Sequence, residues 1–338
     1  FGPTQAAAQL ESSKAFAKDF MKRHRIPTAE YETFTDAAAA HDYVNAKGAP
    51  IVIKADGLAA GKGVVVASTL AEAHEAIDFM LLDNKLGVQH NAGGARVVIE
   101  EFLIGEEASF IVMSDGTNIQ AMATSQDHKR IGNGDTGPNT GGMGAYSPAP
   151  VVTPDVHARV MREIIRPTIE GMKADGITFT GFLYAGLMID AQGRAKTLEF
   201  NTRMGDPETQ PIMMRLKSDL VDVMMHATGG TLDQAELEWD RHAALGVVMA
   251  AAGYPESPRK GDAITDLPPA APDAMVFHAG TVREADGTLR TSGGRVLCVT
   301  ALGESVKTAQ QRAYQHLAGI TFEGAQYRTD IGWRAIRR

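Results

Sequence analysis

The chain has 338 residues, more than the ~100–200 residues of a typical domain, so we expect two or three domains. Apolar residues make up 44% and charged residues 22%, which is typical of globular proteins and argues against a disordered, fibrous or membrane-spanning chain. The net charge of −8 argues against broad electrostatic capture of nucleic acid or an anionic membrane.

Cysteine content and the first residues narrow the class further. Cys298 is the only cysteine, so no intrachain disulfide or cysteine-based metal site can form, and its apolar neighbours predict a buried, inert thiol in a strand. The first twenty residues carry too many charges for a signal peptide, and no apolar run reaches the ~18 residues of a membrane span. We therefore expect a cytoplasmic protein.

The first part of the chain predicts alternating helices and strands. In chain order these are a helix that begins at Ser12 or Ser13 and ends before Pro27, a helix from Asp36 to Ala46, strands at 51–55 and 63–67, a helix after Thr69, and strands at 96–102, 109–113 and 119–123. Thr69 and Glu72 have the spacing of a capping box. The buried stripe of the helix that follows is predicted to be Leu70, Ala73, Ile77 and Leu81.

The rest of the chain predicts a long loop, then helices and strands again. The elements are a glycine-rich loop without secondary structure at 125–150, a helix from Thr153 to about Gly176 with a kink at Pro167, strands at 181–190 and 195–201, strands near Leu245, Val276 and Val296, and a helix carrying Val306, Ala309, Ala313 and Leu317. The change in character predicts a domain boundary near residue 237.

The segment 54–64 is the first candidate site. Its glycines, Gly57, Gly61 and Gly63, let backbone N–H groups approach an anion, and Lys54 and Lys62 supply positive charge. It is not a Walker A motif, because it lacks that motif's first glycine and its Ser or Thr and leads into a strand. A hairpin tip with two solvated lysines is an equally good interpretation of this segment alone.

The segment 198–208 is the second candidate. Strand alternation puts Glu199, Asn201 and Arg203 on one face and Phe200 on the other. A carboxylate and an amide oxygen suit a hard cation such as Mg²⁺, and an arginine beside them can bind the phosphate that the metal holds. A solvated edge strand is the simpler interpretation, but a phosphate-binding segment in the same chain favours the metal site.

Two further segments are weaker candidates. An apolar strand runs through 98–103 into Glu107, where its backbone could bind a purine and the carboxylate a ribose, although acidic residues after a strand are commonly plain surface. The segment 125–146 has six glycines between 132 and 144 and suits a backbone that wraps a small polar ligand. A disordered loop is the alternative, but an apolar Met-Gly-Ala-Tyr end argues against it.

In this order the motifs resemble those of ATP-grasp enzymes, and more narrowly those of the phosphoribosylamine–glycine ligase (glycinamide ribonucleotide synthetase) family of purine biosynthesis. The resemblance covers essentially the whole chain, through residues 1–4, 54–64, 99–102, 127–130, 135–146, 199–208 and 330–335. It implies an α+β ATP-grasp fold in which two α+β units sandwich ATP, followed by a C-terminal mixed α/β domain. The implied domains are 1–30 (linker end and first ATP-grasp helix), 31–102 (lid), 103–236 (main ATP-grasp part) and 237–338 (C-terminal domain).

The resemblance also implies site residues. For ATP these are Lys14, Lys54, Gly57, Gly61, Lys62, Gly63, Glu100, Phe102, Leu103 and Glu107. Glu199 and Asn201 would bind Mg²⁺ or Mn²⁺, and Leu187 occupies the position of a further acidic ligand found in many ATP-grasp enzymes. Substrate and phosphate contacts are implied for Lys129, Arg130, Asp135, Thr136, Asn139, Thr140, Arg203, Asp206 and Glu208.

The reaction that the resemblance implies joins glycine to 5-phosphoribosylamine at the expense of ATP, through glycyl phosphate, by a monomer. No covalent nucleophile on the protein is needed, in agreement with a chain that has no catalytic Cys or Ser–His signature. A different ATP-grasp carboxylate–amine ligase and a non-catalytic nucleotide-binding module are the alternatives. Substrate screening separates the first from this reaction, and acceptor-dependent ADP release excludes the second.

The start of the chain differs from the family pattern. The family begins with a βαβ-type domain that helps to bind phosphoribosylamine, whereas Phe1-Gly-Pro-Thr4 corresponds to the end of that domain. On this basis we expect these residues to bind Mg-ATP and to be a poor ligase by themselves.

Overall fold

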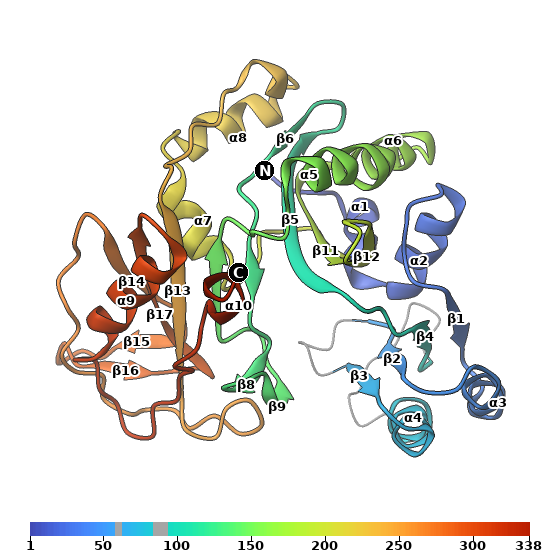
Figure 1. Ribbon diagram of the computed structural model, residues 1–338, viewed down its shortest axis with the longest axis horizontal. Coiled ribbons are helices and arrows are strands. Elements are labelled where there is room, and N and C mark those ends of the chain that lie inside the picture. The colour runs from blue at the N-terminus through green and yellow to red at the C-terminus, as the bar shows by residue number, and fades with distance from the viewer. Residues whose placement is uncertain (58–62, 84–93) are drawn as a thin grey trace. The chain divides into compact units, whose positions relative to one another are not determined.

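The computed structural model describes residues 1–57, 63–83 and 94–338 (Figure 1). The chain divides into two compact units that alternate along the sequence. Unit 1 comprises Phe1–Gln120, Val151–Arg203 and Met224–Gln234, and unit 2 comprises Ala121–Pro150, Met204–Val223 and Ala235–Arg338. Within the described ranges, no helix combines the length and the apolar character that crossing a bilayer requires. The four predicted domains, bounded at residues 30, 102 and 236, stay predictions.

Unit 1 contains two sheets and the helices that cover them. Its helical elements are α1 (Gln5–Ser12), α2 (Lys14–Arg23), α3 (Ala37–Lys47), α4 (Leu70–Ile77), the π-helical turn η1 (Asp78–Leu82), α5 (Pro154–Val160), the π-helical turn η2 (Met161–Ile165), α6 (Arg166–Ala174) and the short 3-10 helix η3 (Leu232–Gln234). Its strands are β1 (Tyr31–Phe34), β2 (Ile51–Ala55), β3 (Val64–Ala67), β4 (Val97–Glu101), β5 (Glu106–Asp115), β6 (Ile119–Ala121), β11 (Thr180–Ile189) and β12 (Ala195–Asn201). The helices and strands predicted in these ranges are confirmed, apart from small shifts at their ends.

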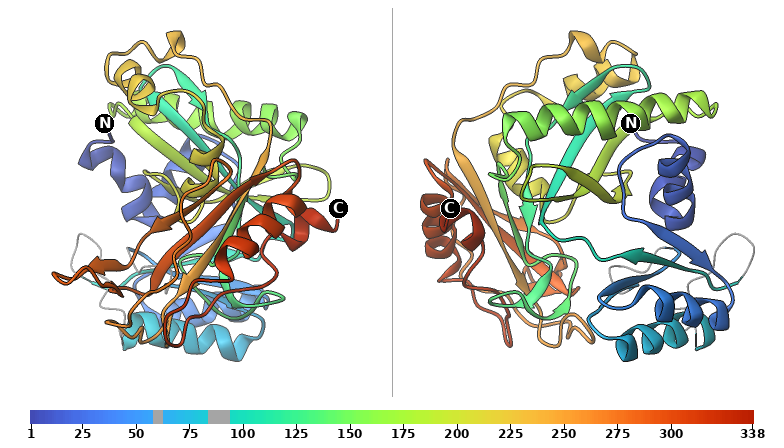
Figure 2. Two further views of the ribbon diagram at one scale, coloured as in Figure 1. Left: turned by 90° about the vertical axis from the view of Figure 1, so that its left-hand side faces the viewer. Right: turned by 45° about the vertical axis from the view of Figure 1, so that its right-hand side comes forward.

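The first sheet has the strand order β1-β4-β2-β3, and all its pairs are antiparallel. Helices α3 and α4 lie side by side against it (Figures 1 and 2), because their alanines and valines pack with the β-branched residues of the strands. The capping box of Thr69 and Glu72 is confirmed. Of the predicted stripe, Ala73 and Ile77 are buried, but Leu70 is 37% exposed. Leu70 lies at the first position of the helix, where the chain has not yet turned its side chain to the sheet.

The second sheet has the order β12-β11-β5-β6. Strands β11 and β12 are joined by a turn in which the Asp190 carboxylate accepts backbone N–H bonds from Gln192 and Arg194. Thr153 caps α5 as predicted, and α5, η2 and α6 follow one another as a continuous helical rod (Figure 2). The π-helical turn directly precedes the segment with Pro167, whose ring lacks the backbone N–H that a regular helix needs.

Unit 2 is built around a five-stranded sheet with the order β14-β17-β13-β10-β7. Its strands are β7 (Gln126–Asp127), β8 (Arg130–Gly132), β9 (Thr136–Asn139), β10 (Gly144–Ser147), β13 (Ala243–Ala250), β14 (Ala274–His278), β15 (Thr281–Arg283), β16 (Leu289–Thr291) and β17 (Arg295–Gly303), and its helices are α7 (Thr209–Arg215), α9 (Val306–Leu317) and α10 (Trp333–Ile336). Helix α8 (Leu220–Thr228) contains the point where the chain passes from unit 2 to unit 1.

The prediction of a structureless loop at 125–150 is wrong. Four short strands lie there, and β8 and β9 pair with each other as a hairpin. Gly134 and Gly137 have positive φ values of 67° and 78°, which let the chain turn tightly between and within these strands. A high glycine content therefore concealed strands that are paired but too short to show an alternating pattern.

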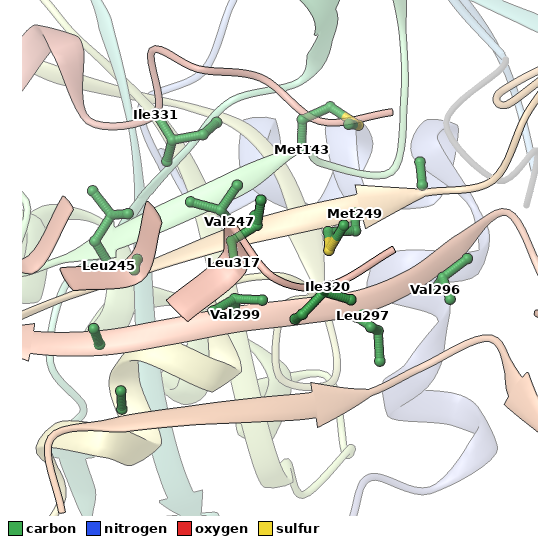
Figure 3. Close-up of a cluster of buried hydrophobic side chains, with 14 of the residues drawn as sticks. Met143, Leu245, Val247, Met249, Val296, Leu297, Val299, Leu317, Ile320 and Ile331 are labelled. Carbon is green, nitrogen blue, oxygen red and sulfur yellow. The ribbon is translucent and has the colours of Figure 1, made fainter. Parts of the chain in front are cut away.

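The core of unit 2 lies between its sheet and α9 (Figure 3). Leu245, Val247 and Met249 alternate along β13 and pack with Leu317 of α9, which confirms the predicted apolar stripe of that helix. Cys298 in β17 is buried, as predicted, and burial raises the pKa of its thiol to about 12. The thiol is therefore protonated at neutral pH and unsuited to act as a nucleophile.

Candidate functional site

The N-terminus of α2 positions Lys14. Ser13 caps this helix by accepting the Phe16 N–H, and the buried Asp56 carboxylate accepts the Ala15 N–H at 3.1 Å. Lys14 Nζ donates to the backbone oxygen of Gly57 at 3.0 Å. Asp56 stands where a Walker A motif would have its first glycine. Its carboxylate thus joins the start of the glycine-rich segment to α2.

Lys54 is buried in β2 and shares one carboxylate with a second lysine. Lys54 Nζ lies 3.0 Å from Glu100 Oε1, and Lys18 Nζ lies 3.0 Å from Glu100 Oε2. Lys18 also donates to Thr28 Oγ1 at 2.7 Å, while Lys54 donates to the backbone oxygen of Leu198 at 3.2 Å. Glu100 was predicted to bind adenine, and in the structure its carboxylate pairs with these two ammonium groups.

Lys14 interacts electrostatically with Lys54 and Glu100. Burial lowers the pKa of Lys14, the Glu199 carboxylate raises it, and the Lys54 ammonium lowers it again. Burial likewise lowers the pKa of Lys18 to about 8, against the opposing effect of Glu100. Lys18 was not singled out in the sequence, since nothing in its spacing distinguishes it from a surface lysine of an amphipathic helix.

The proposed metal ligands lie on β12. The strand pairs Glu199 with Gly186 and Asn201 with Tyr184, and it pairs Leu187, which is buried, with Thr197. Neither Gly186 nor Leu187 adds a carboxylate, and no group of three or more His, Cys, Asp or Glu side chains converges within the described ranges. The donor set of one carboxylate and one amide oxygen fits a hard cation whose remaining ligands are phosphate oxygens and water.

Arg203 follows directly after β12. Its Nη2 lies 3.4 Å from Asn201 Oδ1, and its Nε donates to Glu11 Oε1 at 3.0 Å. Glu11 Oε2 also accepts the Thr202 N–H at 2.9 Å. Glu11, at the end of α1, was not recognised as a site residue in the sequence, although it fixes the segment that carries Arg203.

Three further predicted ATP residues follow β4 in the chain. Phe102 is 40% exposed in the connector after β4, Leu103 follows it, and Glu107 lies in β5. Gly57 has a φ of 139°, a conformation that favours glycine. Gly61 and Lys62 lie outside the described residues, so their predicted roles stay predictions.

In unit 2, the β8–β9 hairpin carries most of the predicted substrate residues. Arg130 Nη1 donates to the backbone oxygen of Gly137 at 2.7 Å, and Thr140 Oγ1 donates to that of Lys129 at 2.9 Å. Asn139 pairs with Arg130 across the hairpin, while Thr136 is exposed and donates to the Asn133 oxygen. Several of these side chains therefore support the hairpin itself.

Asp135 lies at the tip of this hairpin, and its carboxylate accepts hydrogen bonds from two arginines. Arg328 Nη1 donates to its Oδ1 at 2.9 Å, and Arg334 Nη2 donates to its Oδ2 at 2.8 Å. The neighbouring His128 ring and these guanidinium groups hold the pKa of Asp135 well below its ordinary value. Arg328 is fully buried and also binds Asp330. Both arginines were missed in the sequence because they lie almost two hundred residues further along the chain.

Asp206 and Glu208 occupy the segment before α7. The side chain of Asp206 is 51% exposed, and Glu208 is buried with its backbone oxygen at the start of the helix. Arg295 of β17 reaches Asp206 and the glycine-rich segment at 141–142. Of the predicted substrate residues, Arg203 belongs to unit 1 and the others to unit 2.

The sequence matches two family profiles. Residues 12–209 match "Phosphoribosylglycinamide synthetase, ATP-grasp (A) domain", and residues 244–334 match the C domain of the same family. Phosphoribosylamine–glycine ligases from Ralstonia nicotianae and Salmonella typhimurium are 70% and 63% identical to the chain. Both alignments cover 100% of the chain, and 79% and 78% of those proteins.

Solved structures agree with the sequence matches. The phosphoribosylamine–glycine ligase from Thermotoga maritima superposes with a TM-score of 0.87 at 37% identity, over 98% of the chain and 81% of that structure. Biotin carboxylase from Campylobacter jejuni, at 16% identity, shares the fold with a TM-score of 0.73, over 100% of the chain and 72% of that structure. The predicted ATP-grasp fold is confirmed. Membership in this ligase family implies the use of ATP and a divalent metal. The chain therefore belongs to the phosphoribosylglycinamide synthetase family of ATP-grasp ligases.

Proposed function

We propose that this chain catalyses ATP + 5-phosphoribosylamine + glycine → ADP + phosphate + glycinamide ribonucleotide. The observation that carries the proposal is the grouping of Lys14, Lys54 and Glu199 in unit 1. Lys54 Nζ donates to the backbone oxygen of Leu198, the residue before Glu199, and the charges of Lys54 and Glu199 both act on Lys14. Phosphates need such a surface of positive charge, and a metal on the phosphates needs the oxygen donor. The names of the relatives supply the other two substrates.

The chemistry proceeds by two displacements on bound substrates. A carboxylate oxygen of glycine attacks the γ-phosphorus of ATP, the bond from that phosphorus to the bridging oxygen breaks, and ADP leaves. The amine nitrogen of phosphoribosylamine then attacks the carbonyl carbon of glycyl phosphate, a C–N bond forms, and phosphate leaves as the nitrogen loses a proton. The protein contributes position and charge and no covalent bond.

In this proposal, residues of unit 1 bind ATP and the metal. Lys14 and Lys54 neutralise charge on the phosphates, while Phe102 and Leu103 contact adenine and Glu107 contacts the ribose. Glu199 and Asn201 would hold Mg²⁺ or Mn²⁺, which supplies further neutralisation of the phosphate oxygens when it is bound. Arg203, fixed by Glu11, lies beside these ligands and can bind a phosphate oxygen.

The residues of unit 2 bind the other substrates in this proposal. Lys129 and Arg130 offer positive charge to a sugar phosphate, and the remaining predicted contacts are Asp135, Thr136, Asn139, Thr140, Asp206 and Glu208. The acidic balance of the chain supports a metabolic enzyme that acts on small molecules, without nucleic acid or membrane partners. We further propose that it acts as a monomer in the cytoplasm.

Product formation tests the proposal. Purified protein is incubated with ATP, glycine and phosphoribosylamine prepared from ribose 5-phosphate and ammonia, and both ADP and glycinamide ribonucleotide are quantified. ADP release should require both other substrates and should match the ribonucleotide formed. Lys54→Met should abolish product, whereas Lys22→Met, on the exposed side of α2, should not. ADP release that ignores glycine and the amine, or product from another amino acid in preference to glycine, would contradict the proposal.

A further inference from the structure

Arg295 lies at the first position of β17, far in sequence from every predicted site segment, yet its guanidinium group contacts two of them. Its Nη1 donates to the backbone oxygen of Gly141 at 2.9 Å and to that of Asp206 at 2.8 Å. Its Nη2 lies 3.1 Å from Asp206 Oδ2. One side chain thus joins the end of the glycine-rich segment to the segment before α7.

Two glycines, Gly141 and Gly142, allow this close contact between the segments. A Cβ atom on Gly141 would lie 2.7 Å from Arg295 Cζ, so the guanidinium group rests directly on the backbone of that residue. Gly142 has a φ of 122°, and a Cβ atom there would collide with the ring of Pro207. Gly142 is therefore required for the segments to approach each other, and a side chain at Gly141 would displace the Arg295 guanidinium group.

Further contacts fix the groups on either side. The Gly141 N–H donates to the hydroxyl of Tyr254 at 3.0 Å. Gln210 Nε2 donates to Asp206 Oδ1 at 3.0 Å, so both carboxylate oxygens of Asp206 are held. The side chain of Arg295 is 22% exposed, and hydrogen bonds of a partly buried charge are stronger than those of a solvated one.

We infer that Arg295 is a positioning residue that holds the segments 139–142 and 206–208 together as one binding surface for the substrates other than ATP. The inference rests on the proposed function, because Asn139, Thr140, Asp206 and Glu208 are its proposed substrate contacts. A planar guanidinium suits the role, since it can donate to two backbone oxygens and a carboxylate at the same time. Lysine has the charge but lacks this fixed geometry.

Kinetic constants measured separately for ATP, glycine and phosphoribosylamine test the inference. In Arg295→Met, kcat/KM for glycine or for phosphoribosylamine should fall by about 10- to 100-fold, because charge-assisted hydrogen bonds that hold both segments are lost. The KM for ATP should stay within about 2-fold, because the proposed ATP residues belong to unit 1. Free guanidinium chloride at low concentration should restore part of the lost kcat/KM, and Arg295→Lys should restore little.

Two further variants make the result decisive. Gly141→Ala keeps Arg295 but displaces its guanidinium group, so it should give the same loss even if Arg295→Met folds poorly. Arg290→Met is the matched control, because Arg290 in β16 is a half-buried arginine that donates to the backbone oxygen of Gly261, which belongs to neither segment. Wild-type protein that makes no glycinamide ribonucleotide would refute the proposed function. Active wild type together with unchanged constants in Arg295→Met and Gly141→Ala, or an equal rise in the KM for ATP, would overturn the inference alone.

Discussion

Lys18 Nζ lies 3.0 Å from Glu100 Oε2, and both side chains are only 3% exposed. This ion pair connects helix α2 with strand β4, and the other oxygen of the same carboxylate faces Lys54. The buried cluster therefore contains two cations and one anion, which leaves a surplus positive charge. Surplus positive charge in a partly dehydrated setting favours the binding of phosphate, and Lys14 adds to it.

Replacing Lys18 with methionine should destabilise the protein. Methionine fills a similar volume but leaves Glu100 with one cation, and breaking a buried ion pair in this way costs about 3 kcal/mol of the free energy of unfolding. Denaturant unfolding of Lys18→Met and of Lys22→Met, an exposed lysine on the same helix, measures the difference. Equal midpoints for the two variants would mean that the Lys18–Glu100 pair contributes nothing to stability.

The titration of Lys18 should differ from that of the other lysines. Burial lowers its pKa to about 8, so the folded chain releases this proton more readily than the unfolded chain does. Between about pH 8 and pH 10.5 the unfolded state binds more protons at this site, and the contribution of Lys18 to the free energy of unfolding rises with pH. NMR of ¹³C-labelled lysine side chains, assigned with Lys18→Arg, checks this. A midpoint near 10.5 would show that burial has no such effect.

Much of the fold could be predicted because the signals are local. The caps at Ser13, Thr69 and Thr153 appear in the structure as expected from spacing alone. Short strands in glycine-rich sequence carry no such signal, and the sequence therefore predicts a loop where the structure has the hairpin at 130–139.

The candidate site was less accessible to sequence reasoning where contacts are long-range. Glu199 and Asn201 could be selected from strand alternation, but Glu11, Lys18, Arg295 and Arg328 could not. Each of these side chains acts on a segment brought near only by folding, and an isolated charged residue on a helix or strand end resembles ordinary surface. Burial of the charge, which the sequence does not reveal, is what distinguishes Lys18 and Arg328.

Glu199→Gln should weaken metal-dependent nucleotide binding. Glutamine keeps an oxygen donor but removes the negative charge that attracts a divalent cation, so the Kd for Mg-ATP or Mn-ATP should rise by about 10-fold or more. The Kd for ATP in the presence of EDTA should stay the same or fall, since the Glu199 charge then repels the phosphates. Calorimetric titrations with and without metal measure both values. An equal rise in the two constants would show that Glu199 does not bind the metal.

Asp135→Asn should destabilise unit 2 more at neutral pH than in acid. Asparagine tolerates the left-handed backbone of this residue, φ 58°, as well as aspartate does, so the change removes charge without adding strain. The fully buried Arg328 then loses one of the two carboxylates that it binds and keeps Asp330, and the loss should be about 3 kcal/mol at pH 7.

The pH dependence of this loss follows from the pKa of Asp135. The His128 ring and the two arginines lower that pKa in the folded chain, so the stabilisation is complete above the ordinary range of an aspartate and is lost as the pH falls below it. The difference between wild type and Asp135→Asn in thermal unfolding should therefore shrink between pH 7 and pH 3. Glu284→Gln, at an exposed carboxylate between β15 and β16, serves as control and should unfold like wild type at both pH values. A difference that does not shrink in acid would mean that Asp135 acts through its shape and hydrogen bonds rather than its charge.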